Sequence, residues 1–413
     1  MRKSHLLIIA LFAASIFLAG CPAPGPAPPP GDETGWTQEG VDSVVNANNQ
    51  FALDLYSEFK DDPGNVFFSP WSITTAVSMT YEGAKGQTAD EMKSVFHFSG
   101  NDAVRRPSFA RVQNQINAAQ SQYLLRSANA LWAEQTYPFL EEYTALIEKY
   151  YSARVENMDF INDSEGSRET INTWVENQTN DRIQDLIPQG VITPYTRMVL
   201  TNAIYFKGTW VKEFKKENTR KGDFHVAPDK TVSADMMHLS EEEFNYAEND
   251  ELQILELPYK GENLSMLILL PRGNDITSLE NSLTSEKLSG LRNQMGEQEV
   301  IITLPKFKFE AKYFLSETLA QMGMPTAFDE DEADFSGMDG TDDLFISQVI
   351  HQSFVEVNEE GTEAAAATAI IVMGSSAMPQ NIFTADHPFI FIIQEKETGN
   401  ILFLGRVSDP TKQ

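Results

Sequence analysis

The order in which two apolar patterns occur along the chain constrains the fold more than any other feature of the sequence. Helical spacing dominates the first half, in the ranges 41–56, 70–79, 88–96, 109–122, 138–150 and 164–179. A short strand at 65–68 is followed much later by strand-like runs at 198–206, 252–257, 264–270, 300–309 and 345–357, and by a hairpin at 388–394 and 401–407. Because the later runs are mostly apolar, both faces of their sheets must be covered. The pattern predicts an α+β fold in which helices cover large sheets.

The first twenty residues have the pattern of a secretory signal and are excluded from the fold. A basic start precedes an apolar run at 6–18, which is too short for a comfortable membrane span. Residues 18–21 (LAGC) resemble the lipobox of prokaryotic lipoproteins, in which the signal is cut before a cysteine that then receives lipid. Cys21 is the only cysteine, so no intramolecular disulfide can form. We expect an extracytoplasmic, cell-surface lipoprotein anchored to a prokaryotic membrane; the alternative is a plain secretory signal with an unmodified thiol.

The segment after the cysteine is dense in proline, alanine and glycine and cannot form a core. No internal repeat and no second linker follow it. The sequence therefore predicts a signal peptide at 1–20, a Pro-rich tether at 21–35 and one folded domain at 36–413.

Charge and missing motifs exclude several functions. The formal net charge of −29 argues against nucleic acid as a partner, because phosphates require a basic surface. The sequence contains no HExxH, GxSxG, Walker or GxGxxG motif, and its single cysteine excludes a cysteine-rich zinc site. We therefore expect no cofactor, no metal and no enzymatic turnover. A basic stretch at 212–221 would allow a polyanion site, although a solvated loop is favoured there.

The alanine-rich segment at 359–372 allows two interpretations. It could be a surface helix, or a loop that is able to become a strand. With period two, one face of the segment carries only small or apolar uncharged side chains, namely Thr362, Ala364, Ala366, Thr368, Ile370 and Val372. A charge on that face would oppose burial in a closed sheet, because an unpaired buried charge is costly.

Five ordered motifs make the chain resemble the serpin family from about Trp36 to the C-terminus. They are NVFFSPWSI at 65–73, LTNAIYFKGTW at 200–210, FHV at 224–226 with MMH at 236–238, VNEEGTEAAA at 357–366, and FTADHPFIF at 383–391. The resemblance implies a serpin fold with three β-sheets, about nine helices and an exposed reactive loop. It also implies an irreversible suicide-substrate inhibitor: a serine protease forms an acyl-enzyme with the loop, the loop inserts into the main sheet, and deacylation stalls.

The resemblance assigns roles to matched positions. The hinge comprises Glu359, Gly361, Thr362, Glu363, Ala364, Ala365, Ala366 and Ala367. The shutter under the strands comprises Ser69, Ser72, Asn202 and His351, and the breach at the top of the main sheet comprises Trp210, Lys306 and Glu359. The implied reactive bond joins Ser375 to Ser376, with Met373, Gly374 and Met378 as rivals.

The sequence around the implied bond gives a weak indication of the target. Residues 372–375 contain no lysine or arginine, which disfavours trypsin-like enzymes and leaves elastase-, subtilisin- or chymotrypsin-like proteases. The expected partners are such a protease, bound covalently, and a membrane reached through the N-terminal lipid; the domain is expected to be a monomer. Two alternatives stay open. One is a non-inhibitory serpin-fold binding protein, whose hinge would usually be charged or bulky, and the other is a surface adhesin or enzyme of another class.

Overall fold

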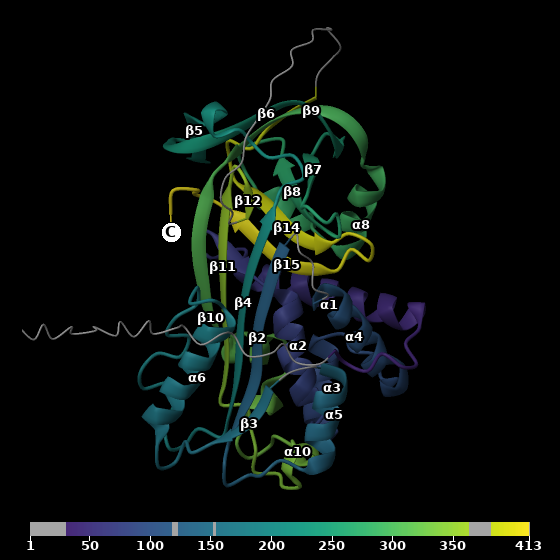
Figure 1. Cartoon of the computed structure of the whole chain (residues 1–413), viewed down its shortest axis with the longest axis vertical. Helices are drawn as coiled ribbons and strands as arrows, with labels where there is room; N and C mark the ends of the chain where they lie inside the picture. The colour runs from purple at the N-terminus through teal and green to yellow at the C-terminus, as the bar shows by residue number, and fades with distance from the viewer. Residues whose placement is uncertain (1–29, 118–122, 152–153, 363–380, 413) are drawn as a thin grey trace, which may run out of the picture.

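The structure is a computed structural model that describes residues 30–117, 123–151, 154–362 and 381–412. Within these ranges it contains ten α-helices: α1 (Gln38–Phe59), α2 (Pro70–Tyr81), α3 (Gly86–Val95), α4 (Asp102–Asn117), α5 (Glu141–Tyr151), α6 (Ser164–Gln178), α7 (Thr277–Ser282), α8 (Ser285–Gln294), α9 (Ser316–Met322) and α10 (Ser336–Asp339). Most of them gather in the lower half of the molecule, while strands dominate the upper half (Figure 1). The expected α+β class is confirmed, with one helix more than the nine expected.

Two hydrogen-bonded sheets contain the described strands. The larger has the order β1 (Val66–Phe68), β15 (Ile401–Val407), β14 (Phe389–Glu395), β8 (Leu264–Pro271), β7 (Leu252–Pro258), β6 (Lys230–Glu248), β9 (Gly296–Pro305) and β13 (Asn381–Thr384), with β5 (Arg220–Ala227) on β6. The smaller has the order β10 (Phe307–Phe314), β11 (Gln348–Asn358), β12 (Gly361–Thr362), β4 (Met198–Thr209), β2 (Tyr123–Glu134) and β3 (Arg154–Met158).

The expected third sheet is not separate, because one long strand joins two groups of strands. The first part of β6 pairs with β5 and with the end of β9, and its last residues pair with β7. A register shift between Leu239 and Glu242 divides the two parts. The bulge bends the strand without breaking its hydrogen bonding, so the two groups of strands count as one sheet.

The helix that lies beneath the smaller sheet begins as its sequence predicts. Ser69 is extended at the N-cap of α2, and its side chain accepts a hydrogen bond from the backbone N–H of Ser72 at 3.2 Å. Pro70 occupies the first turn, where no partner for its missing N–H is needed. The cap fixes where α2 starts and so places both serines under β4 and β11.

Two predicted elements differ from the structure. The strand expected at 300–309 is two strands, because the chain leaves the larger sheet at Pro305 and enters the smaller one at Phe307. The helix expected at 109–122 already begins at Asp102 and includes Pro107 in its second turn, where proline removes only one backbone hydrogen bond. Residues 118–122 of that expected helix lie outside the described residues.

Ordered packing begins before the predicted start of the domain at Trp36. The backbone of buried Gly31 exchanges two hydrogen bonds with the Asn114 side chain of α4, at 2.9 and 2.8 Å. The backbone N–H of Asp32 donates to the carbonyl of Lys149 on α5, and the two side chains form an ion pair at 3.4 Å. The last five residues of the expected tether, 31–35, therefore form a strap together with Trp36, and this strap (residues 31–36) lies against α4 and α5.

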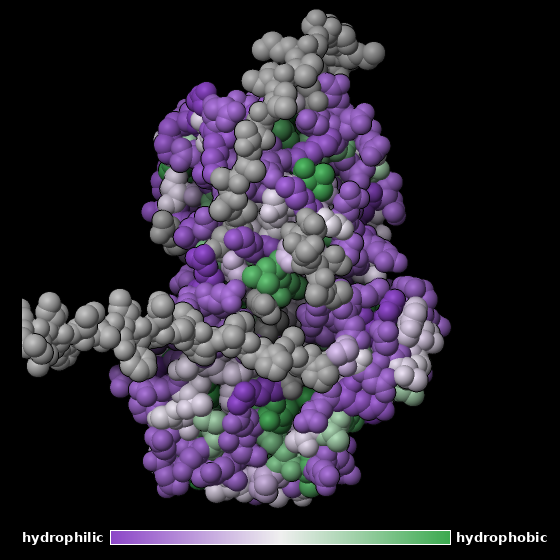
Figure 2. All heavy atoms as spheres, viewed as in Figure 1, coloured by the Kyte–Doolittle hydropathy of each residue, from purple (hydrophilic) through white to green (hydrophobic). Residues whose placement is uncertain are grey.

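Most of the visible surface consists of hydrophilic residues (Figure 2), as expected for a chain with a net charge of −29. None of the described helices combines the length and the apolar character that crossing a membrane requires. The described residues also contain no group of three or more His, Cys, Asp or Glu that could hold a metal ion.

Candidate functional site

The two central strands of the smaller sheet are paired at one end and separated at the other. Parallel pairing between β4 and β11 runs from Val199 opposite Gln348 to Tyr205 opposite Phe354. Beyond that point, the two residues of β12 lie between the strands and pair antiparallel with both of them. Gly361 lies opposite Thr209 and Asn358, and Thr362 lies opposite Gly208 and Val357. The start of the predicted hinge is therefore already a short central strand, and the gap closes directly below it.

Glycines make this close approach of three strands possible. Gly361 has a φ of +151°, and a Cβ on it would collide with the carbonyl oxygen of Gly208. A Cβ on Gly208 would itself lie 2.6 Å from the Phe206 ring and 2.7 Å from the Tyr259 ring. Both positions exclude larger residues because of local backbone and ring contacts. Glycine is therefore required at position 361 both for its positive φ and for the space that a Cβ would occupy.

Thr362 is held from below by an aromatic pair. Its side chain is 1% exposed, and its hydroxyl shares a hydrogen bond of 2.7 Å with the Tyr259 hydroxyl. The Tyr259 ring stacks on the Trp210 ring with centroids 4.5 Å apart, and both rings are buried. Burial raises the pKa of Tyr259, so the phenol stays neutral and can share this bond at ordinary pH. The predicted breach tryptophan therefore contacts the hinge through a tyrosine that the sequence did not single out.

The turn before the hinge is fixed by the segment that follows β4. The backbone N–H groups of Trp210 and Phe214 donate to the carbonyls of Glu360 and Glu359, at 2.9 and 2.8 Å. The Glu359 carboxylate pairs with Lys306 at 2.9 Å and accepts a hydrogen bond from Thr219 at 2.8 Å. Burial raises the pKa of Glu359, but the hydrogen bonds from Lys306 and its neighbours outweigh burial and lower it overall. Glu359 is therefore ionised and holds the turn in place.

A buried polar network crosses the line along which β4 and β11 would have to part. Asn202 of β4 lies opposite His351 of β11, and the two side chains are hydrogen-bonded to each other. The Asn202 amide also donates to the Ser72 hydroxyl at 2.5 Å and to the Asn129 side chain of β2 at 2.6 Å. The Ser69 backbone N–H donates to Nε2 of His351 at 3.0 Å. The four predicted shutter residues are thus brought together, and separating the strands would break their network.

His351 must be neutral to fit this network. Its Nε2 accepts a hydrogen bond, so Nδ1 carries the proton and donates to the Asn202 carbonyl oxygen. The ring is fully buried, and burial lowers its pKa to about 3. The Tyr313 ring stacks on the His351 ring, with the two ring centroids 6.3 Å apart. Burial raises the pKa of the Tyr313 phenol to about 12, so Tyr313 is also neutral.

Acidification is expected to destabilise the fold through His351. Its pKa is lower when folded (about 3) than when unfolded (about 6.5), so this contribution to stability is complete above pH 6.5 and is lost as the pH falls toward 3. The expected slope is up to about 1.4 kcal/mol per pH unit. The measurement is the urea midpoint between pH 4 and 8 for the wild type and for His351→Gln, which keeps polar groups but does not titrate. Equal slopes for the two proteins would contradict the assignment to His351.

The structure thus describes some of the predicted site residues and not others. Glu359, Gly361, Thr362, the shutter residues, Trp210 and Lys306 lie within the described residues and in the contacts given above. The remaining positions lie outside the described residues: Cys21, Glu363, Ala364, Ala365, Ala366, Ala367, Met373, Gly374, Ser375, Ser376 and Met378.

Three residues in the site were missed by the sequence analysis. Tyr259 directly follows β7 and Thr219 directly precedes β5, and no local sequence pattern marks either residue as a partner of the hinge. Asn129 lies in β2, a strand that was not predicted because its middle is rich in alanine, serine and asparagine. The basic stretch at 212–221 supplies lysines to carboxylates, as in the pairs Lys216–Glu360 and Lys221–Asp235.

Comparisons with known proteins agree on one family. A family model described as "Serpin (serine protease inhibitor)" matches residues 46–410. An uncharacterized serpin-like protein of Thermococcus kodakarensis is 43% identical over 99% of both chains. Human leukocyte elastase inhibitor is 42% identical over 90% of this chain and 100% of its own length. The crystal structure of Serpin48 of the insect Tenebrio molitor has a TM-score of 0.80 and 36% identity, covering 89% of this chain and 98% of that one.

Proposed function

Since this chain belongs to the serpin family, whose members are protease inhibitors and generally not enzymes, we propose that it is an irreversible, suicide-substrate inhibitor of serine proteases. In the proposed mechanism, the protease serine attacks a bond in the loop after Thr362 and forms an acyl-enzyme. The loop then inserts between β4 and β11, and the protease attached to it is carried along and distorted before deacylation. The native form must therefore be kinetically trapped, with insertion held back until the loop is cut.

The observation that carries this proposal is the position of β12. Residues 361 and 362 already occupy the place of a central strand and pair in a defined register with both neighbours. Continuing that register one residue at a time would place Thr368 opposite both Asn202 and His351. The same extension would bring Val372 opposite Met198, where β4 begins. The sheet can thus accept the loop as far as residue 372, with the shutter residues directly in its path.

The register also supports the proposed position of the reactive bond. A loop cut after Ser375 leaves enough chain to fill β4 to its first residue, whereas a cut several residues earlier would leave the new strand short. The uncharged residues before that bond suit elastase-, subtilisin- or chymotrypsin-like pockets. The relative named leukocyte elastase inhibitor adds support for the first of these classes.

The test is to mix the protein with elastase, subtilisin, chymotrypsin and trypsin and to analyse the products on denaturing gels with mass spectrometry. The expected result is a protease–inhibitor complex that survives denaturation for at least one of the first three enzymes, and a released C-terminal peptide that begins at Ser376. Trypsin should give less complex than the others, because no basic residue precedes the bond. Cleavage without any stable complex would overturn the proposal and favour a non-inhibitory binding protein.

For the N-terminal segment we propose signal cleavage before Cys21, lipidation of that cysteine and display on the outer side of a prokaryotic membrane. The support is the sequence at 18–21 and the fact that Cys21 is the only cysteine. Expression in a bacterium grown with radiolabelled palmitate should label the wild type and leave Cys21→Ser unlabelled. Equal label in the two proteins, or no label in the wild type, would exclude lipidation at this residue.

A further inference from the structure

A cavity of about 280 Å³ lies between α1, α2 and α4, away from the hinge and the shutter. Its apolar wall consists of Val44 and Ala47 of α1, Phe109 of α4, and Phe98 from the segment that precedes α4, whereas α2 contributes Thr74 and Ser78. Exposed residues such as Glu39 and Asn101 surround its mouth, and buried Ser78 and Arg105 border its inner end. Its volume is roughly twice the ~150 Å³ of a cavity that encloses benzene, so it suits a ligand of about ten non-hydrogen atoms.

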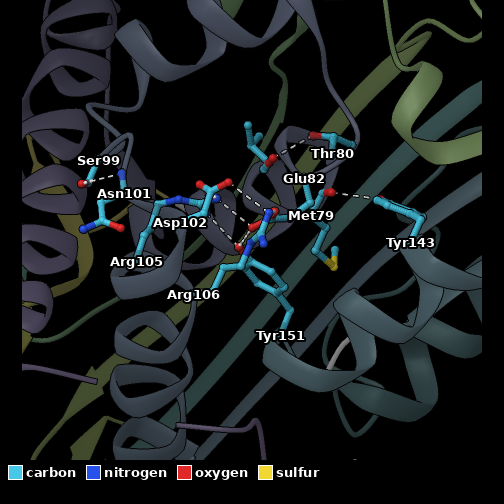
Figure 3. A network of polar contacts seen from close by, with 11 residues as sticks. Met79, Thr80, Glu82, Ser99, Asn101, Asp102, Arg105, Arg106, Tyr143 and Tyr151 are labelled. Carbon is cyan, nitrogen blue, oxygen red and sulfur yellow. Dashed lines mark hydrogen bonds and ion pairs between the residues drawn. The ribbon is translucent and has the colours of Figure 1, made fainter. Parts of the chain in front are cut away.

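The charged groups behind the inner end are already balanced. Arg105 donates to Glu82 at 2.8 Å and to Asp102 at 2.8 Å, and Arg106 contacts the same two carboxylates, as Figure 3 shows. The Tyr151 hydroxyl donates to Glu82 at 2.5 Å and accepts from Arg105 at 3.0 Å. Two guanidinium groups thus neutralise two carboxylates. No net charge is left in this cluster to attract an ionised ligand.

Two polar atoms next to the cavity have no partner. The Ser78 hydroxyl and the Nε–H of Arg105 find no hydrogen-bond partner among the described residues, although Ser78 is 0% and Arg105 is 3% exposed. The Arg105 guanidinium carbon lies over the rings of Tyr81 and Phe98, at 4.9 and 5.7 Å from their centroids. Buried polar groups without partners are rare, and each lowers stability until a partner reaches it. The serine hydroxyl can rotate toward the cavity without losing an existing bond.

We propose that this cavity binds a small, electrically neutral, amphipathic molecule, with an apolar body along Val44, Ala47 and Phe109 and a hydroxyl or carbonyl oxygen at Ser78 and Arg105. An anion is disfavoured by Glu39 at the mouth and by the net charge of −29. A cation is disfavoured because its head would lie against the Arg105 guanidinium. Medium-chain alcohols and amides have the required shape and polarity. The inference does not depend on protease trapping.

The experiment titrates 1-octanol into the chain from residue 21 onward, carrying Cys21→Ser so that neither the signal nor a lipid is attached, and follows binding by calorimetry. Octanoate and octylammonium are the charged probes of equal chain length. Ala47→Leu fills the cavity from α1 and should weaken octanol binding at least tenfold. Ala145→Leu, on the exposed face of α5, is the matched control and should bind like the parent protein. Ser78→Ala removes one polar partner and should weaken binding several-fold.

One octanol per chain, displaced in the cavity-filling variant and retained in the control, supports the proposal. Val44→Phe occupies the same space from the preceding turn and replaces Ala47→Leu if that variant does not fold. No saturable binding of octanol, or equal binding in the filled variants, overturns the site. Octanoate or octylammonium binding as tightly as octanol overturns the assignment of a neutral ligand. Unchanged binding in Ser78→Ala overturns the role given to its hydroxyl.

Discussion

Replacing Thr362 by aspartate is expected to abolish protease trapping and to leave the chain as a substrate that is cut and released. Thr362 is 1% exposed, and its hydroxyl lies 2.7 Å from the neutral Tyr259 hydroxyl. A carboxylate there would be buried among apolar rings without a cation, at a cost of several kcal/mol. We therefore expect β12 of the variant to leave the sheet before cleavage, so that insertion must first bury the charge. Each 1.4 kcal/mol that this adds to the barrier slows insertion about tenfold, so deacylation would be completed first.

Thr362→Asn is the matched control, because asparagine has the size of aspartate but no charge. It should retain most of the complex formed by the wild type, since its amide can still bond to Tyr259. The measurement is the ratio of denaturation-resistant complex to cleaved inhibitor at equal protease concentration. We expect a fall of at least a hundredfold in that ratio for the aspartate variant only. Equal ratios for the two variants would mean that burial of this side chain does not control the outcome.

Cutting the loop without forming a complex is expected to raise the thermal transition temperature strongly. The inserted strand would pair with β4 and β11 along residues 363 to 372, replacing the direct contact between those two strands. Roughly ten further residues at about 1 kcal/mol of net hydrogen bonding each give a gain on the order of 10 kcal/mol. At about 2 °C per kcal/mol for a chain of this size, the transition should rise by roughly 20 °C.

Calorimetry before and after cleavage by a non-target protease measures this shift. The Thr362→Asp variant provides the internal control, because the same cut should yield a much smaller gain when insertion also requires a charge at position 362 to be buried. An unchanged transition in the cleaved wild type would contradict insertion. It would then favour a loop that hangs free after cleavage.

The sequence predicted the local parts of the site better than its long-range contacts. Ser69 and Pro70 define where α2 begins through bonds within a single turn, so their pattern suffices to place the shutter serines. The alternating small residues at 362–372 left both a surface helix and a loop open, and the hinge was assigned through the resemblance of residues 357–366 to the serpin family. These features depend on neighbours in sequence.

What the sequence could not predict depends on residues that are far apart along the chain. Tyr259 reaches Thr362 across 103 positions, and Thr219 reaches Glu359 across 140. The strand expected at 300–309 hid a change of sheet at Lys306, because apolar residues continue on both sides of it. The hydrophobic alternation along 300–309 is compatible with a strand in either sheet, so only tertiary packing determines where β9 ends and β10 begins.

The docked strap, residues 31–36, determines how much chain would lie between a lipid on Cys21 and the folded domain. With Gly31 fixed to Asn114, nine residues (22–30) lie between the proposed anchor and Gly31, and these ten Cα–Cα steps can span at most about 35 Å. A force applied through the lipid-anchored tether would act on α4 and α5, because the strap is bonded to Asn114 and Lys149. Neither helix is part of β4 or β11, the two strands that would separate in the proposed mechanism. The anchor can therefore restrain the molecule near a bilayer without opposing the movement of its loop.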